Sequence, residues 1–123
     1  MARILVVDDD DAILHIVSRV LEGLDMEVVT AGSGQEALAL FTERRPDAVL
    51  TDVYMPDVDG IELILGIRDV DETVPIVAMS GGGYAPADFV LEDAAQLGAD
   101  AILNKPFQVE DLVGVIQSVL GGS

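Results

Sequence analysis

The sequence contains no cysteine and no tryptophan, and no apolar run of the length that a membrane span needs. Without cysteine there is no disulfide framework and no thiolate-bound metal. A membrane-spanning helix needs about 20 apolar residues, and the N-terminal apolar run is too short for a signal peptide. We therefore expect a cytoplasmic protein with one domain over residues 1–123, whose core runs from about residue 3 to about residue 120.

Basic residues are also scarce: six Lys and Arg stand against 23 Asp and Glu, for a formal net charge of −17. This balance argues against direct binding to nucleic acid or to an anionic membrane, because both require a basic surface. It also implies self-repulsion where acids cluster, which a bound cation would relieve. Lys105 is the only lysine, and it follows an apolar run, an unusual place for a charge that serves only solubility.

Short apolar runs alternate with stretches of helical periodicity along the whole chain. The first run, Arg3–Val7, is continuous, which is typical of a strand covered on both faces. Expected strands cover residues 3–7, 27–30, 47–51, 74–79 and 100–103, and one helix pattern fits after each of them. Such crossovers predict an α/β fold: a doubly wound, five-stranded parallel sheet with helices on both faces.

The third run delivers an acid to the end of a strand. Ala48-Val49-Leu50 is followed by Thr51 and Asp52, and then by Pro56 and Gly60. Proline cannot extend a central strand, and glycine permits backbone angles that other residues avoid, so the strand should stop soon after Asp52. A carboxylate held by a rigid strand suits chemistry, although a solvated Asp at the start of a loop remains the alternative.

Polar residues follow four of the five expected strands. They are Asp8 and Asp9 after the first, Asp52 after the third, Ser80 after the fourth and Lys105 after the fifth. In a parallel sheet these strand ends share one edge, where ligands bind in α/β folds, so the side chains should converge. The second strand contributes no comparable group, which fits a position at the side of the sheet.

The run of four acids after the first strand is longer than a helix cap needs. Capping and the helix dipole account for Asp10 and Asp11. Facing carboxylates are costly without a cation, and hard oxygen ligands select Mg²⁺, with Mn²⁺ as the alternative ion. We expect Asp9 and Asp52 to bind the ion directly and Asp8 to act through water. Three acids, a hydroxyl and an ammonium together indicate a phosphoryl site.

A set of motifs in this order resembles the receiver domain of two-component response regulators, as in chemotaxis regulators. The motifs are Val6-Val7-Asp8-Asp9, Asp52-Val53-Tyr54-Met55-Pro56, Asp59-Gly60, Ser80 and Lys105-Pro106-Phe107. The resemblance implies a flavodoxin-like (βα)5 fold with strand order 2-1-3-4-5. It also implies that Asp52 is the phospho-acceptor and that Ser80 is the switch hydroxyl. Lys105 would contact the phosphoryl group, with the Lys105–Pro106 bond cis. The acidic pair would hold Mg²⁺, with the backbone carbonyl of Tyr54 as a further ligand.

The resemblance further implies the partners and the mechanism. A histidine kinase or phosphorelay protein would phosphorylate Asp52, and self-dephosphorylation would follow, without turnover of a separate substrate. The face formed by the fourth helix, fifth strand and fifth helix would contact a downstream protein, and exposed apolar positions would also suit a homodimer. The family usually has an aromatic residue where this chain has Ile102. We therefore expect the loop 81–83 to carry the switching signal instead.

Two other functions remain open at this point. One is a receiver-like binding module that signals without phosphorylation, although such proteins usually lose an acid or the lysine. The other is a phosphatase of the haloacid-dehalogenase type, with Asp8 as nucleophile in an Asp-x-Asp motif completed by Asp10. Phosphoryl uptake at Asp52 would distinguish both from a receiver.

Overall fold

The structure, a computed structural model, describes residues 1–53, 60–80 and 95–121. The described residues form strands β1 (Arg3–Val7), β2 (Glu27–Ala31), β3 (Ala48–Asp52), β4 (Ile76–Ser80) and β5 (Ala101–Asn104). The helices are α1 (Asp11–Glu22), α2 (Gly34–Arg44), α3 (Gly60–Val70) and α5 (Val109–Gly121). The strands lie in the order β2-β1-β3-β4-β5, and all neighbours are parallel. The predicted fold class and the outer position of β2 are confirmed.

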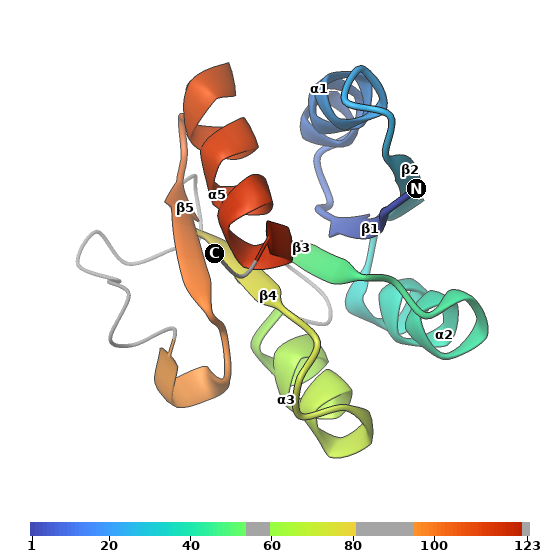
Figure 1. Cartoon of the computed structure of the whole chain (residues 1–123). Coiled ribbons are helices and arrows are strands. Elements are labelled where there is room, and N and C mark those ends of the chain that lie inside the picture. Colours follow the sequence, from blue (N-terminus) through green and yellow to red (C-terminus); the bar gives the residue numbers. More distant parts are fainter. Residues whose placement is uncertain (54–59, 81–94, 122–123) are drawn as a thin grey trace.

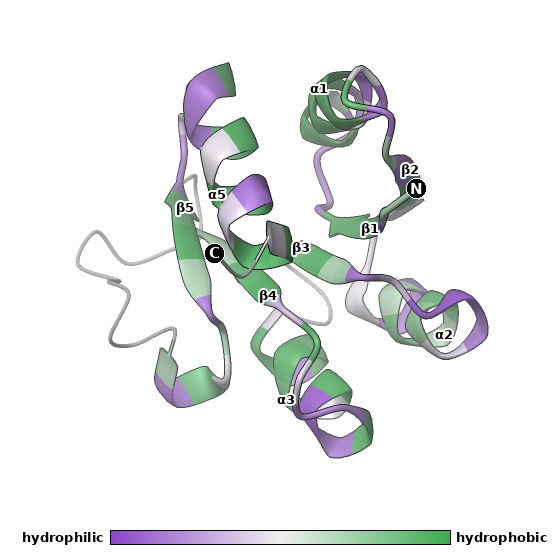
Figure 2. Cartoon of the chain, in the orientation of Figure 1, coloured by the Kyte–Doolittle hydropathy of each residue, from purple (hydrophilic) through white to green (hydrophobic). Residues whose placement is uncertain are grey.

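Helices cover both faces of the sheet, α1 and α5 on one side and α2 and α3 on the other (Figure 1). Alternate residues of β1 serve the two sides: Ile4 and Val6 pack in the core under α1 and α5, whereas Leu5 and Val7 pack in the core under α2 and α3. All four are buried, because successive strand side chains point to opposite faces. Figure 2 shows the matching apolar sides of the helices turned toward the sheet.

Strands β2, β3 and β5 end one residue later than the sequence predicts, at Ala31, Asp52 and Asn104, and β4 runs to Ser80. At the ends of β3, β4 and β5 the ladder continues: the Val53 N–H donates to the carbonyl of Met79 at 3.1 Å, and the Lys105 N–H donates to the carbonyl of Ser80 at 2.7 Å. The backbone of a strand that is hydrogen-bonded to its neighbours moves less than the backbone of a loop. The polar groups at this end of the sheet are therefore held by the sheet itself.

Side-chain oxygens cap the first two helices. The Asp10 carboxylate accepts from the backbone N–H of Ala12 at 2.9 Å, and the Ser33 hydroxyl accepts from that of Glu36 at 3.2 Å. Each bond satisfies a backbone donor that the first helical turn leaves without a partner. Asp10 therefore serves α1, as expected.

At the other end of the sheet, Arg68 joins α3 to the starts of β4 and β5. Its guanidinium donates to the carbonyl oxygens of Val74 and Gly98, each at 2.7 Å, and to the carboxylate of Asp100 at 3.0 Å. Gly98 has a φ of 112°, in the region where glycine is favoured, which agrees with the predicted helix end there. Arginine suits this place because its planar group donates in several directions at once.

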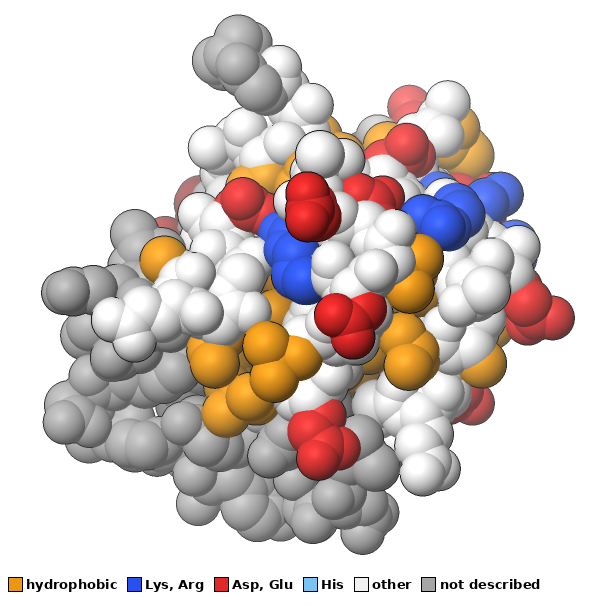
Figure 3. Space-filling model, turned by 90° about the horizontal axis from the view of Figure 1, so that it is seen from below, with side chains coloured by type: hydrophobic (Ala, Val, Ile, Leu, Met, Phe, Trp, Pro, Cys, Tyr) orange, Lys and Arg blue, Asp and Glu red, His pale blue; other side chains and the backbone are white. Residues whose placement is uncertain are grey.

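On at least one face of the molecule, the acidic side chains are scattered over the surface. Figure 3 views the molecule from below, the side of α2 and α3, and shows acidic side chains spread among uncharged ones and basic side chains in two small groups. The described residues on this face do not form the continuous basic surface that nucleic acid requires (Figure 3). Within the part of the chain that the structure describes, no helix is long and apolar enough to cross a membrane.

Candidate functional site

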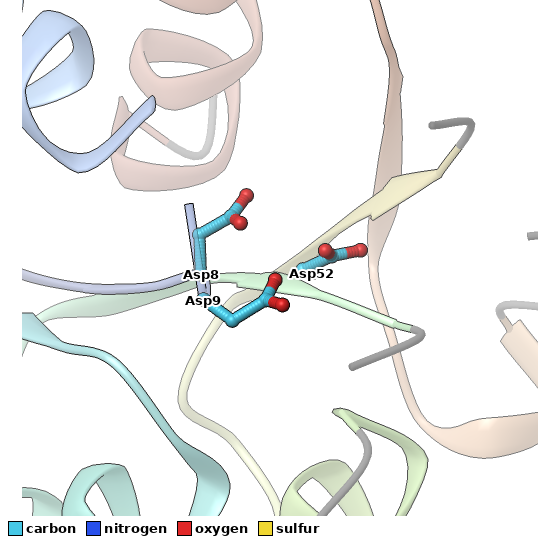
Figure 4. A group of neighbouring side chains, drawn as sticks. All are labelled: Asp8, Asp9 and Asp52. Atoms are coloured by element: carbon cyan, nitrogen blue, oxygen red, sulfur yellow. The ribbon is translucent and has the colours of Figure 1, made fainter. Parts of the chain in front are cut away.

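Three carboxylates gather at the end of the sheet where β1 and β3 finish. Asp8, Asp9 and Asp52 each offer an oxygen within 4.8 Å of the others. Figure 4 shows the three side chains side by side. Asp8 is fully buried and Asp52 is 4% exposed, whereas Asp9 lies at the surface. The convergence predicted from the sequence occurs because β1 and β3 are parallel neighbours.

The ammonium of Lys105 reaches this cluster from the residue after β5. It donates to Asp8 Oδ2 at 2.6 Å and to Asp52 Oδ2 at 3.3 Å, and its side chain is 14% exposed. Burial opposes the charged form, but the hydrogen bond to Asp8 and the charges of both acids prevail and raise the pKa of Lys105. Lys105 is therefore a cation at neutral pH. The Lys105–Pro106 peptide bond is cis, as expected.

The cluster suits a divalent cation. Three carboxylates face a single ammonium, which leaves an excess of negative charge, and oxygen is the ligand type that Mg²⁺ prefers. Partial burial, and then the charge of Asp8, raises the pKa of Asp9 above its ordinary 3.8. A bound cation would offset both the cost of burying the Asp9 charge and its repulsion from Asp8. Tyr54, whose backbone carbonyl is the further predicted ligand, lies outside the described residues.

We expect Asp9→Asn to raise the melting temperature of the metal-free protein at neutral pH. Because its pKa is raised in the fold, Asp9 binds its proton more tightly in the folded state than in the unfolded chain. Its ionisation therefore costs folding stability as pH rises above 3.8. The advantage of the variant should be full at neutral pH and vanish as pH falls to that value, which thermal denaturation across this pH range would measure.

With Mg²⁺ present, we expect the unmodified protein to have a higher melting temperature than Asp9→Asn. A ligand that binds only the folded state stabilises it by about 2.7 kcal/mol at 100 times its Kd. Mg²⁺ should therefore raise the melting temperature of the unmodified protein and have much less effect on Asp9→Asn. The matched control is Asp11→Asn, because Asp11 is an exposed acid on α1 outside the cluster. An equal Mg²⁺ response in Asp9→Asn and the unmodified protein would contradict a ligand role for Asp9.

Ser80 lies at the end of β4, beside the end of β3, but its hydroxyl already has a partner. It donates to Oδ1 of Asn104 at 2.7 Å. Asn104 was not among the residues predicted for the site. The available signal was its position between the apolar residues of β5 and Lys105, but only the strand register shows that it lies opposite Ser80.

Gly60 is required for a different reason from the one expected. Its φ is not in the left-handed region; instead, its N–H donates to the carbonyl of Val53 at 2.8 Å, and α3 begins against the end of β3. A Cβ at this position would lie 1.8 Å from the carbonyl oxygen of Asp52. The need is therefore steric: only hydrogen fits where the chain approaches the backbone of Asp52.

The chain matches the sequence profile of one family over nearly its whole length. The profile of the response regulator receiver domain matches residues 4–117. The matched range includes all three acids of the cluster, Ser80 and Lys105.

Curated relatives of this chain are regulators about twice its length. The transcriptional regulatory protein PrrA of Mycobacterium tuberculosis is 39% identical over 118 residues, which cover 96% of this chain and 49% of PrrA. The response regulator MprA of Mycolicibacterium vanbaalenii is 40% identical over 120 residues, covering 96% of this chain and 50% of MprA. The chain thus spans about half the length of these relatives.

Solved structures share the whole fold. The chemotaxis protein CheY4 of Vibrio cholerae is 34% identical, with a TM-score of 0.87 and coverage of 98% of this chain and 99% of that one. A response regulator receiver domain protein of Clostridium thermocellum is 32% identical, with a TM-score of 0.88 and coverage of 99% and 96%. The likeness therefore extends over the sheet and its helices.

Proposed function

The chain belongs to the response regulator receiver domain family, and from this premise we propose that Asp52 accepts a phosphoryl group from the phosphohistidine of a histidine kinase or phosphorelay protein. The observation that carries the proposal is the placement of Asp52. Its carboxylate is almost fully buried at the end of a central strand, 3.3 Å from the Lys105 ammonium and within reach of two further acids.

The proposed step is an in-line substitution at phosphorus. An oxygen of Asp52 forms the new O–P bond while the P–N bond to the donor histidine breaks, and the electron pair of that bond stays on the imidazole nitrogen. Lys105 lies where its charge stabilises the phosphoryl oxygens. Mg²⁺, when held by Asp9 and Asp52 with Asp8 acting through water, would neutralise further charge on those oxygens.

Hydrolysis would complete the cycle at the same residue. Water attacks the phosphorus of the acyl phosphate, inorganic phosphate leaves, and the Asp52 carboxylate is restored. We propose no separate substrate for the chain. The haloacid-dehalogenase alternative is less well supported, because the carboxylate of Asp10, the second acid of its Asp-x-Asp motif, caps α1.

Output through protein contact is the second part of the proposal. β5 and α5 belong to the expected contact face, while most of the helix expected before β5, and the loop 81–83, lie outside the described residues. PrrA is described as a transcriptional regulator. Where a chain like this one works within such a protein, we propose that DNA contact belongs to other parts, because the receiver itself is strongly acidic.

Intact mass after incubation with a small phosphodonor tests the proposal. With acetyl phosphate or phosphoramidate and Mg²⁺, we expect a gain of one phosphoryl group that is lost on treatment with hydroxylamine, which cleaves acyl phosphates. Replacing Mg²⁺ with EDTA should prevent the gain. If neither donor gives it, the receiver-like binding module becomes the better reading. A gain that resists hydroxylamine would exclude a carboxylate acceptor.

A further inference from the structure

Ser80 and Asn104 form a hydrogen-bonded polar pair at the site end of β4 and β5. They are register partners in the sheet, so their side chains stand on the same face. The Ser80 hydroxyl donates to Asn104 Oδ1 at 2.7 Å, and the Lys105 N–H holds the two backbones together through the Ser80 carbonyl. Ser80 is 3% exposed, whereas Asn104 is exposed.

A serine hydroxyl carries one proton and can donate it to only one acceptor at a time. If Asp52 is phosphorylated, as proposed above, a hydrogen bond from Ser80 to a phosphoryl oxygen requires the bond to Asn104 to break. We propose that Asn104 is a positioning residue that competes with the phosphoryl group for the Ser80 proton. It thereby sets how much of the phosphorylated protein adopts the switched state.

The difference in exposure makes this pair suitable for a two-state exchange. When Asn104 is released, its amide is hydrated by solvent at little cost, because it is already at the surface. Buried Ser80 has little access to water, so its hydroxyl has to exchange one protein acceptor directly for another. Ile102, two residues earlier on β5, is apolar and cannot take part in such an exchange.

The competition predicts a measurable gain in affinity when the acceptor is removed. A net hydrogen bond changes an equilibrium constant by about 2- to 12-fold. Beryllium trifluoride with Mg²⁺ mimics a phosphoryl group on a carboxylate without being hydrolysed. We expect Asn104→Ala to bind it about 2- to 12-fold more tightly than the unmodified protein. Titration followed by NMR would give both dissociation constants, and circular dichroism would confirm that each variant folds.

The matched control removes the proton for which the two acceptors compete. In Ser80→Ala, adding Asn104→Ala should leave the dissociation constant unchanged, whereas a general effect on the site would persist. Equal affinity in Asn104→Ala and the unmodified protein, or the same change in both backgrounds, would overturn the role of Asn104.

Failure of the proposed function has a separate signature. It would appear as no beryllium trifluoride binding by the unmodified protein, or as binding that Asp52→Asn does not weaken. Binding that requires Asp52 but ignores Asn104 leaves phosphorylation at Asp52 intact and overturns only the competition. If Asn104→Ala binds beryllium trifluoride more tightly only when Ser80 is present, the result supports both phosphorylation at Asp52 and the competition for the Ser80 proton.

Discussion

Asp52→Asn is expected to abolish the gain of one phosphoryl group from acetyl phosphate. The amide lacks the carboxylate charge and is a much weaker nucleophile, while its size is nearly the same. Its oxygen can still accept from Lys105, which lies 3.3 Å from Asp52. The variant should therefore fold and lose only the chemistry. Intact mass measures the loss, and an unchanged or higher melting temperature would show that the fold is retained.

Asp10→Asn is the matched control for this substitution. Asp10 is another acid at the same end of the sheet, but its carboxylate caps α1 through Ala12. Asparagine caps a helix about as well as aspartate, so this variant should take up the phosphoryl group normally. Uptake by Asp52→Asn would mean that another carboxylate is the nucleophile, and Asp8 would be the next residue to replace.

Gly60→Ala is expected to destabilise the fold by about 3 kcal/mol and to slow phosphoryl uptake. The added Cβ would lie 1.8 Å from the carbonyl oxygen of Asp52 and 2.8 Å from the Cα of Val53. These are backbone atoms of a central strand and its end, so they cannot move aside as a flexible side chain could. Either α3 or the end of β3 must shift, and the latter displaces the Asp52 carboxylate.

Gly114→Ala provides the contrasting substitution. Gly114 lies within α5, and among the described residues no atom other than the adjacent residues and backbone of its own helix lies within 4 Å of the Cβ that alanine would add. Alanine at such a helical position should stabilise the fold by about 0.5–1 kcal/mol. Urea unfolding of both variants measures the two effects, and acetyl phosphate uptake measures the chemistry. If Gly60→Ala were as stable as the unmodified protein, the close approach of α3 to β3 would not hold in solution.

Much of the fold could be predicted from the sequence because it depends on local periodicity. The continuous apolar run of β1 indicates burial on both faces, and the alternation of strands with helices dictates parallel pairing. Parallel pairing in turn places all carboxyl ends of the strands at one edge. The approach of Asp8, Asp9, Asp52 and Lys105 to one another follows from that topology, although no two of these strands are adjacent in the sequence.

The contacts between strands could not be predicted, because they depend on register and on the approach of backbones remote in sequence. Asn104 becomes the acceptor of the Ser80 hydroxyl only when β4 and β5 pair with these residues opposite each other. Gly60 is required only because α3 starts against the end of β3. Arg68 likewise meets its carbonyl partners through the packing of α3. The sequence by itself determined which groups reach the site, whereas the tertiary structure decided which of them are already engaged, because hydrogen bonds require distances that periodicity does not contain.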